Sequence, residues 1–250
     1  HLNNIRNNMD KCFVQTADID LNGISWVTIG NKTNRFTGSY DGKGFSISNL
    51  TINDTENDYL GLFGYISTPA HLKNIKLINA NVKGRKFIGT LVGWNERGKI
   101  CNCSSTNCSV NGYSDAGGLV GVLYGGLIRD CFTTGNVNSY EANMGGLVGF
   151  SNRLQEDAII QRCYSTANVS STHSGDLGGL VGDNSCIIRD SYATGTVTGG
   201  DFRGGLVGNN RTRSNYGGRI FNSYSISNSN IALVGRKENF NPAVTIVVNS

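Results

Sequence analysis

Hydrophobic residues in this chain form short clusters separated by polar residues that favour turns. The clusters are rich in β-branched and aromatic side chains, and the segments between them are rich in Gly, Asn, Ser and Asp, which is typical of strands joined by turns. One cluster, Gly-Gly-Leu-Val-Gly in its most regular form, recurs along the chain. Its closing glycines stand at positions 64, 93, 121, 149, 182, 208 and 235, with spacings of 29, 28, 28, 33, 26 and 27 residues. No repeat contains an amphipathic run long enough for a helix, so an all-β chain is predicted.

A second block follows the regular clusters. It reads Ile128–Val137, Ile160–Val169 and Ile188–Val197, with degenerate copies from Leu72, Ile100 and Ile220. A period near 28 residues with about three short strands indicates one coil of a solenoid, which buries its apolar face by stacking on the next coil. We therefore predict a right-handed parallel β-helix of about seven coils.

In such a helix, equivalent positions of successive coils form rows, which we call ladders. The expected core ladders are Leu119, Leu147, Leu180 and Leu206, and Val137, Val169 and Val197. The repeated glycines are expected at tight corners or at positive φ, where a Cβ would clash.

The ends of the chain depart from the repeat. Residues 1–58 are interpreted as an N-terminal cap and the first coils, with one or two helical turns over His1–Asn8. Residues 59–238 form the repeat region, and residues 239–250 a C-terminal tail or cap. Because the chain begins at His1 without a methionine or a signal peptide, we expect it to be part of a larger chain.

These motifs resemble the GLUG repeat of bacterial cell-surface and secreted proteins. The segments Ala17–Leu21, Phe36–Gly44 and Ile47–Leu50 are similar to the block that usually precedes those repeats. The resemblance implies an extracellular β-helical module of the kind found in adhesins and in non-catalytic regions of immunoglobulin A1 peptidases. It does not imply one activity. The zinc-binding His-Glu-x-x-His motif of those peptidases is not in this sequence, whose histidines stand at 1, 71 and 173.

The composition excludes several classes of protein and of partner. The chain has 34 glycines, 2 prolines and 16 % charged residues, a balance that argues against disorder and against collagen. The net charge of +4 is scattered without a basic stripe, so nucleic acid is not an expected partner. No apolar run approaches the roughly 18 residues of a membrane span, so the chain is not expected to cross a bilayer.

The seven cysteines include one row at equivalent positions, Cys103, Cys131 and Cys163, which Ser191 and Ser223 continue. A stacked thiol or metal site is one interpretation. The second interpretation is a row of small buried residues, and it is favoured because serine replaces cysteine at two positions of the row. The Cys101, Cys103 and Cys108 cluster lacks a fourth zinc ligand.

The residue after each closing glycine forms the main candidate binding site. Tyr65, Trp94, Val122 and Phe150 would stack into a mostly aromatic stripe with Tyr124 nearby, before Asp183, Asn209 and Arg236 continue the row. Such a stripe could bind a glycan or a host surface protein. The favoured interpretation, however, is a corner ladder of side chains that stack on one another and shield a turn. For a second ladder, Phe132, Tyr164, Tyr192 and Tyr224, a stabilising role is the stronger interpretation.

Two weaker sites follow from polar loops. Asp54, Glu56 and Asp58 offer alternate carboxylates for calcium, although a solvated turn is the favoured interpretation. No other cofactor is expected. The longest repeat interval holds an insertion within 150–176, where His173, Asp176 and Arg162 could serve acid–base chemistry.

Two functions are compatible with this sequence. The favoured one is a non-catalytic module of a bacterial surface or secreted protein, acting as an adhesive segment or a rigid spacer. The alternative is a polysaccharide lyase, which needs a base and a cation around one sugar carboxylate. A spacer should look alike on every coil, and only the 150–176 region breaks the repeat clearly.

Overall fold

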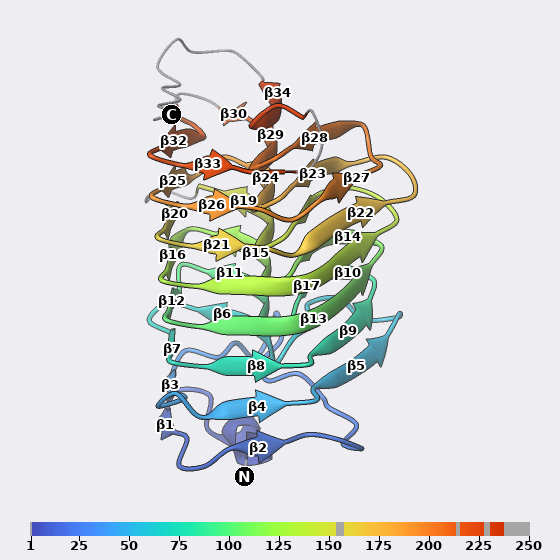
Figure 1. Ribbon diagram of the computed structural model, residues 1–250. Coiled ribbons are helices and arrows are strands. Elements are labelled where there is room, and N and C mark those ends of the chain that lie inside the picture. Colours follow the sequence, from blue (N-terminus) through green and yellow to red (C-terminus); the bar gives the residue numbers. More distant parts are fainter. Residues whose placement is uncertain (1, 154–157, 214–215, 228–230, 238–250) are drawn as a thin grey trace.

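The computed structural model describes residues 2–153, 158–213, 216–227 and 231–237. Successive coils rise along one axis from the N-terminal end, and the complete coils pass through four parallel sheets in the same order (Figure 1). Strands on the front face run from left to right as the chain climbs, which gives the helix its right-handed sense (Figure 1). The predicted right-handed parallel β-helix is confirmed.

Sheet 1 contains eight strands: the N-terminal block contributes two, and one follows each of the first six closing glycines. Its strands are β1 (Cys12–Val14), β3 (Ser39–Asp41), β7 (His71–Lys73), β12 (Lys99–Cys101), β16 (Gly126–Arg129), β20 (Ala158–Gln161), β25 (Ile187–Arg189) and β32 (Arg219–Phe221).

Sheet 2 is the largest, with twelve strands. Its main path is β2 (Ile19–Asp20), β4 (Ser46–Ser48), β8 (Lys76–Ile78), β13 (Ser104–Gly112), β17 (Phe132–Ser139), β21 (Tyr164–Ser165), β26 (Tyr192–Ala193) and β33 (Tyr224–Ser225). Beside this path lie β5 (Thr51–Asp54), β9 (Asn81–Gly84), β22 (Asn168–Ser171) and β27 (Val197–Thr198).

Sheets 3 and 4 complete each coil. Sheet 3 consists of β10 (Lys86–Gly89), β14 (Ser114–Gly117), β18 (Met144–Gly145), β23 (Asp176–Gly178) and β28 (Phe202–Gly204). Sheet 4 consists of β6 (Phe63–Ser67), β11 (Val92–Glu96), β15 (Val120–Tyr124), β19 (Val148–Asn152), β24 (Val181–Asn184), β29 (Val207–Asn210) and β34 (Val234–Lys237). A short antiparallel pair, β30 (Thr212–Arg213) and β31 (Tyr216–Gly217), lies outside these sheets.

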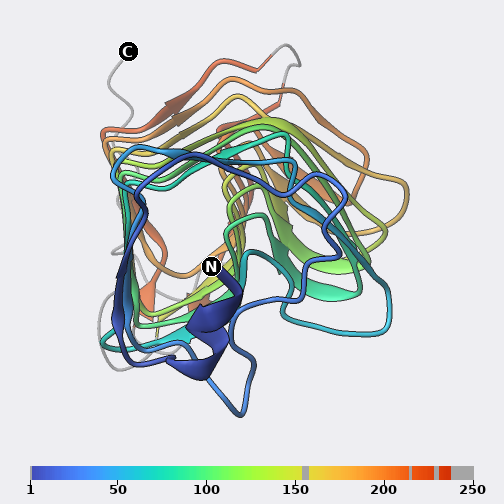
Figure 2. The same ribbon diagram turned by 90° about the horizontal axis from the view of Figure 1, so that it is seen from below.

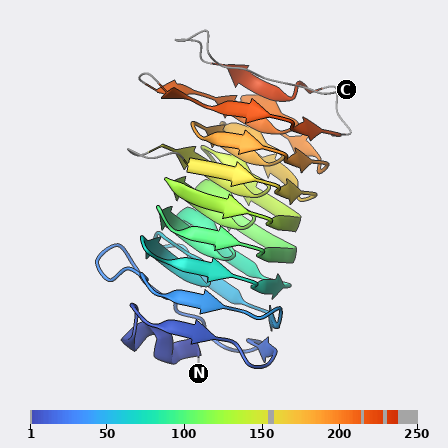
Figure 3. The ribbon, with the colours of Figure 1, turned by 90° about the vertical axis from the view of Figure 1, so that its left-hand side faces the viewer.

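The coils superpose along the axis (Figure 2) and form regular tiers from the side (Figure 3). Both predicted core ladders are confirmed: Leu119, Leu147, Leu180 and Leu206 are fully buried and joined by backbone hydrogen bonds, and Val137, Val169 and Val197 pair in register. At the N-terminal end, where helical turns are expected, a 3-10 helix, η1 (Leu2–Asn7), buries Leu2 and Ile5. The predicted C-terminal tail, 239–250, lies outside the described residues.

The closing glycines allow the backbones of sheets 3 and 4 to come into contact. A Cβ on Gly121 would lie 2.5 Å from the backbone nitrogen of Ile88, and one on Gly182 would lie 2.4 Å from that of Met144. Neither glycine has a positive φ. Close approach of two backbones therefore explains these glycines, rather than a left-handed conformation.

The left-handed conformation occurs at a different position, the corner between sheets 1 and 2. Asn74, Asn102, Asp130, Arg162, Asp190 and Asn222 all have φ between 44° and 56°. Asn and Asp tolerate this region better than other side-chain-bearing residues, which explains most of the row. In the part of the chain that the structure describes, no helix is long and apolar enough to span a membrane.

Candidate functional site

The residues after the closing glycines form one continuous row along the outside of sheet 4. Strand pairing places them one above another in the order Tyr65, Trp94, Val122, Phe150, Asp183, Asn209 and Arg236. We call this the sheet 4 row. Its lower half is aromatic and its upper half polar, so the row has two chemically different ends.

Aromatic rings surround Trp94 in the lower half. Tyr65 stacks on it at 5.9 Å between ring centroids, with the planes 16° apart, and Tyr124 lies 5.6 Å away on the next coil. Tyr59 and Phe87 meet it edge to face at 5.9 and 5.1 Å. The rings thus stack on one another, as the corner-ladder interpretation expects, and Trp94 and Tyr124 stay only partly exposed.

Tyr65 is the most deeply placed member of this cluster, with 5 % of its surface exposed. Its hydroxyl donates to Glu96 Oε2 at 3.1 Å, and Glu96 also forms an ion pair with Arg35. The Arg35 guanidinium lies over the Tyr65 ring. Burial raises the pKa of Tyr65, and the Glu96 carboxylate raises it further, so this phenol stays protonated.

The upper half of the row joins a buried polar cluster. Asp183 is fully buried, and its Oδ2 lies 2.7 Å from Arg211 Nε. Arg211 also reaches Asp176 Oδ2 at 3.2 Å, to which Asn209 Nδ2 donates at 3.0 Å. Sequence reasoning placed Asp183 and Asn209 in the row but missed Arg211. The change from aromatic to polar residues at one repeat position was the available signal.

Of the predicted binding residues, Tyr65, Trp94 and Tyr124 lie together, while Val122 separates them from Phe150. Phe150 is half-exposed. Binding at these residues remains a prediction, and Tyr124 and Phe150 are the members through which it can best be tested.

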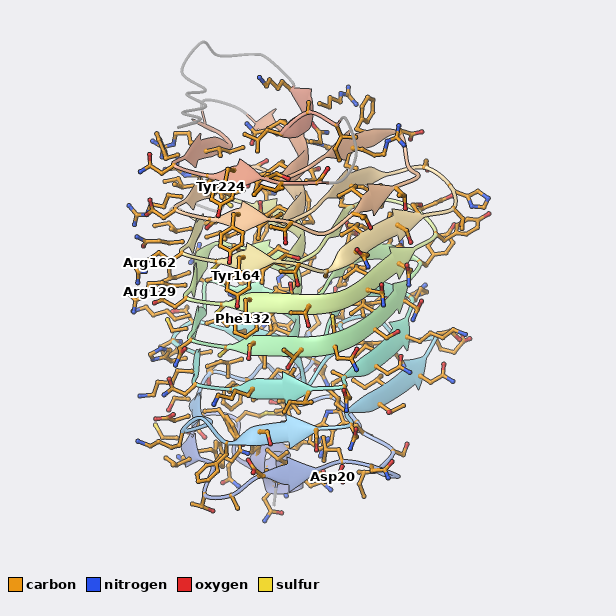
Figure 4. The ribbon with its side chains drawn as sticks, in the orientation of Figure 1. Asp20, Arg129, Phe132, Arg162, Tyr164 and Tyr224 are labelled. Carbon is orange, nitrogen blue, oxygen red and sulfur yellow. The ribbon has the colours of Figure 1, made fainter. Side chains whose placement is uncertain are left out.

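The second aromatic ladder lies on the outer face of sheet 2. Figure 4 shows Phe132, Tyr164 and Tyr224 one above another on the front face, with Arg129 and Arg162 at its left-hand edge. From Phe132 through Tyr164 and Tyr192 to Tyr224, ring centroids are 4.8, 5.0 and 5.2 Å apart and the planes within 7° of parallel. Each inner ring has both faces covered, so the ladder presents ring edges rather than stacking platforms.

The Cys and Ser row is held by hydrogen bonds. Cys131 Sγ accepts from the backbone N–H of Cys103 at 3.4 Å, and Ser191 Oγ accepts from that of Cys163 at 3.1 Å. Burial raises the pKa of Cys131 and Cys163, which keeps these thiols protonated. All seven cysteines are free. The residues are small and buried, as predicted, but they also act as donors and acceptors.

The acidic residues considered for calcium have other partners. Asp54 accepts from the backbone N–H groups of Glu56 and Asn57 at 3.1 and 3.0 Å, and Asp58 pairs with Arg85 at 3.0 Å. Among the described residues, no group of three His, Cys, Asp or Glu side chains is placed to hold a metal ion.

The structure separates the residues considered for acid–base chemistry. Arg162 pairs with Asp130 at 2.7 Å at the corner of sheets 1 and 2. His173 stacks on Tyr140 at 3.7 Å between ring centroids, in the loop between β22 and β23. Asp176 belongs to the Arg211 cluster. These three side chains therefore have partners in different parts of the coil, and residues 154–157 of the same insertion lie outside the described chain.

Comparison with known proteins supports this architecture. The sequence profile of the GLUG motif matches residues 112–138 and 173–198. A candidate immunoglobulin A1 protease from Bacteroides ovatus has a similar fold, with a TM-score of 0.61 over 90 % of this chain and 81 % of that one. At 19 % sequence identity, the likeness is one of fold.

Two curated proteins match part of the chain. It is 36 % identical over 115 residues to a candidate Gly-rich membrane protein of Evansella cellulosilytica, covering 42 % of this chain and 13 % of that protein. It is 38 % identical over 103 residues to halomucin of Haloquadratum walsbyi, covering 36 % of this chain and 1 % of halomucin. The chain thus spans a small fraction of the length of either relative.

Proposed function

We propose that this chain is a non-catalytic β-helical module of a larger surface or secreted bacterial protein, and that it acts as a rigid segment with a binding face. The observation that carries the proposal is the continuity of the core. The inner rows repeat in register from coil to coil, so the chain varies mainly on its outer rows.

A continuous core suits a rigid spacer. Stacked coils bury their apolar faces only against their neighbours, so bending the solenoid would open parallel strand pairs and expose core side chains. The GLUG repeats and the name of the Evansella relative agree with a location at the cell surface.

The binding role is assigned to the partly exposed aromatic residues of sheet 4. Trp94, Tyr124 and Phe150 combine apolar surface with an accessible edge, a chemistry suited to sugars and to protein surfaces. The lyase alternative has weaker support, because its proposed base and cation have separate partners in this fold.

A glycan-array screen, run in parallel with a depolymerisation assay on acidic polysaccharides, tests this proposal. Binding without turnover that is lost in Tyr124→Ala and Phe150→Ala would support it. Tyr192→Ala, on the opposite ladder, is the matched control and should bind normally. Release of unsaturated ends that depends on His173 or Arg162 would replace the proposal with a lyase, and silence in both assays would leave only the spacer role.

A further inference from the structure

A pocket of about 520 Å³ lies away from the sheet 4 row, where the strands beside sheet 2 turn into sheet 3. Residues of β9, β13 and the connections that follow these two strands form most of its wall. The members that carry its chemistry are Lys83, Arg85, Lys86, Asn111, Tyr113 and Tyr140. Its volume is within the usual range for pockets that hold small ligands.

One wall of the pocket is aromatic. Tyr113 and Tyr140 stack at 5.4 Å with their planes 18° apart, and His173 continues the stack beyond Tyr140. Both tyrosines are more than 40 % exposed. The stack ends at Tyr113, because the chain segment below it carries Arg85, whose carbonyl accepts from the Tyr113 backbone N–H. One face of Tyr113 thus has no further ring against it among the described residues.

The other wall is cationic. Arg85 is held by a two-point contact with Asp58, with Nε and Nη2 each 3.0 Å from a carboxylate oxygen. Lys83 is exposed and Lys86 is half-exposed, and the ion pairs of the described residues include neither ammonium group.

Two acidic groups lie nearby. The charge of Lys86 lowers the pKa of Asp115, although burial raises that pKa overall, and Asp115 Oδ1 accepts from Asn143. Asp54 accepts from backbone N–H groups of its own loop.

Glu141 is the acidic group beside the aromatic wall. Its charge and a hydrogen bond with the phenol raise the pKa of Tyr113, and it does not line the pocket. The walls therefore combine an exposed tyrosine with two lysines that form no ion pair within 4 Å among the described residues, and with a guanidinium fixed by Asp58.

We propose that this pocket binds an acidic sugar unit, a uronate or a sulfated hexose within a polysaccharide. The C–H face of the sugar ring packs on Tyr113, and its carboxylate or sulfate lies between Lys83 and Lys86. A single-stranded nucleic acid fits less well, because the cations are confined to this pocket and do not continue as a stripe. This proposal rests on the proposed function, because it assigns a ligand class to the binding module and gives the module a second binding site.

The test measures binding of alginate and chondroitin sulfate oligomers by calorimetry, with carboxyl-reduced alginate as the uncharged probe. Wild type should bind both acidic oligomers, and the reduced form at least about tenfold more weakly. The Lys83→Ala/Lys86→Ala variant should lose about tenfold or more in affinity. The Lys76→Ala/Lys99→Ala variant removes the same charge from two exposed lysines outside the pocket and should bind as wild type does.

The ring is tested separately from the charges. Tyr113→Ala should weaken binding by about tenfold, and Tyr113→Phe, which keeps the ring, should stay within about twofold of wild type. Equal loss in both double-lysine variants would mean unspecific charge attraction and would overturn the site.

The remaining outcomes distinguish failure of the pocket proposal from failure of the proposed function. Acidic-glycan binding that survives the pocket variants but fails in Tyr124→Ala would refute the pocket and leave the proposed function standing. Wild type that binds neither acidic probe would also overturn the pocket. If the array then shows no binding of any kind, the binding half of the proposed function fails as well.

Discussion

The sulfur of Cys131 accepts a hydrogen bond from the backbone N–H of Cys103, one coil below, at 3.4 Å. The same sulfur donates to the carbonyl of Arg129 at 3.2 Å. Ser191 repeats the arrangement two coils higher, accepting from Cys163 at 3.1 Å and donating to Arg189 at 2.8 Å. The thiol and the hydroxyl therefore form the same two hydrogen bonds in this row, which explains why cysteine and serine interchange there.

Cys131→Ser should keep this hydrogen bond and change the free energy of unfolding by less than about 1 kcal/mol, whereas Cys131→Ala should cost about 1–3 kcal/mol. Alanine is small enough for the site but leaves the buried Cys103 N–H without its acceptor. Urea denaturation of the two variants measures the difference. If alanine is tolerated as well as serine, the row is held by packing alone.

Gly182→Ala should destabilise the protein by about 3 kcal/mol, because its Cβ would lie 2.4 Å from the backbone nitrogen of Met144 and neither backbone can move without disturbing a strand. Gly23→Ala is the control. Gly23 has φ of +72° and nothing within 4 Å, so alanine there should cost only about 1 kcal/mol of conformational strain. Equal losses in thermal unfolding would show that conformational freedom, not close approach, explains the repeated glycine.

The repeat made most of the fold predictable. A spacing near 28 residues defines the coil, and equivalent positions such as Leu119 and Leu147 then have to stack. Contacts between different rows were not predictable in this way. Arg211 stands outside the regular clusters, so nothing in the spacing connects it with Asp183, and the pocket at Tyr113 exists because Arg85 occupies the place where another ring would extend the stack.

Asp41 should make the protein less stable in acid. Burial alone would raise the pKa of Asp41, but hydrogen bonds from Asn74, the Lys43 backbone and Lys73 outweigh burial and lower the pKa to about 2. Because the unfolded pKa is about 3.9, the stabilisation is fully present above about pH 4 and is lost as the pH falls through about 2. Asp41→Asn should therefore be less stable than wild type at neutral pH, with a smaller further loss across that interval. Identical pH slopes in urea denaturation would contradict the assignment.

Arg211→Met should be the most damaging single change in the polar cluster that adjoins the upper half of the sheet 4 row. It removes a cation 2.7 Å from Asp183 Oδ2, and Asp183 is fully buried. Loss of one partner from a buried ion pair typically costs about 3–5 kcal/mol, because the remaining charge stays desolvated. The free energy of unfolding from urea titration is the measurement.

Two further variants test whether the loss of stability in Arg211→Met arises from the buried charge of Asp183. Arg162→Met removes an equally close partner from Asp130, but that pair is exposed, so the expected cost is below about 1 kcal/mol. The double variant Arg211→Met/Asp183→Asn removes the buried Asp183 charge as well as the Arg211 cation and should recover part of the loss. A double variant no more stable than Arg211→Met would show that Arg211 stabilises the upper coils through packing rather than through its charge.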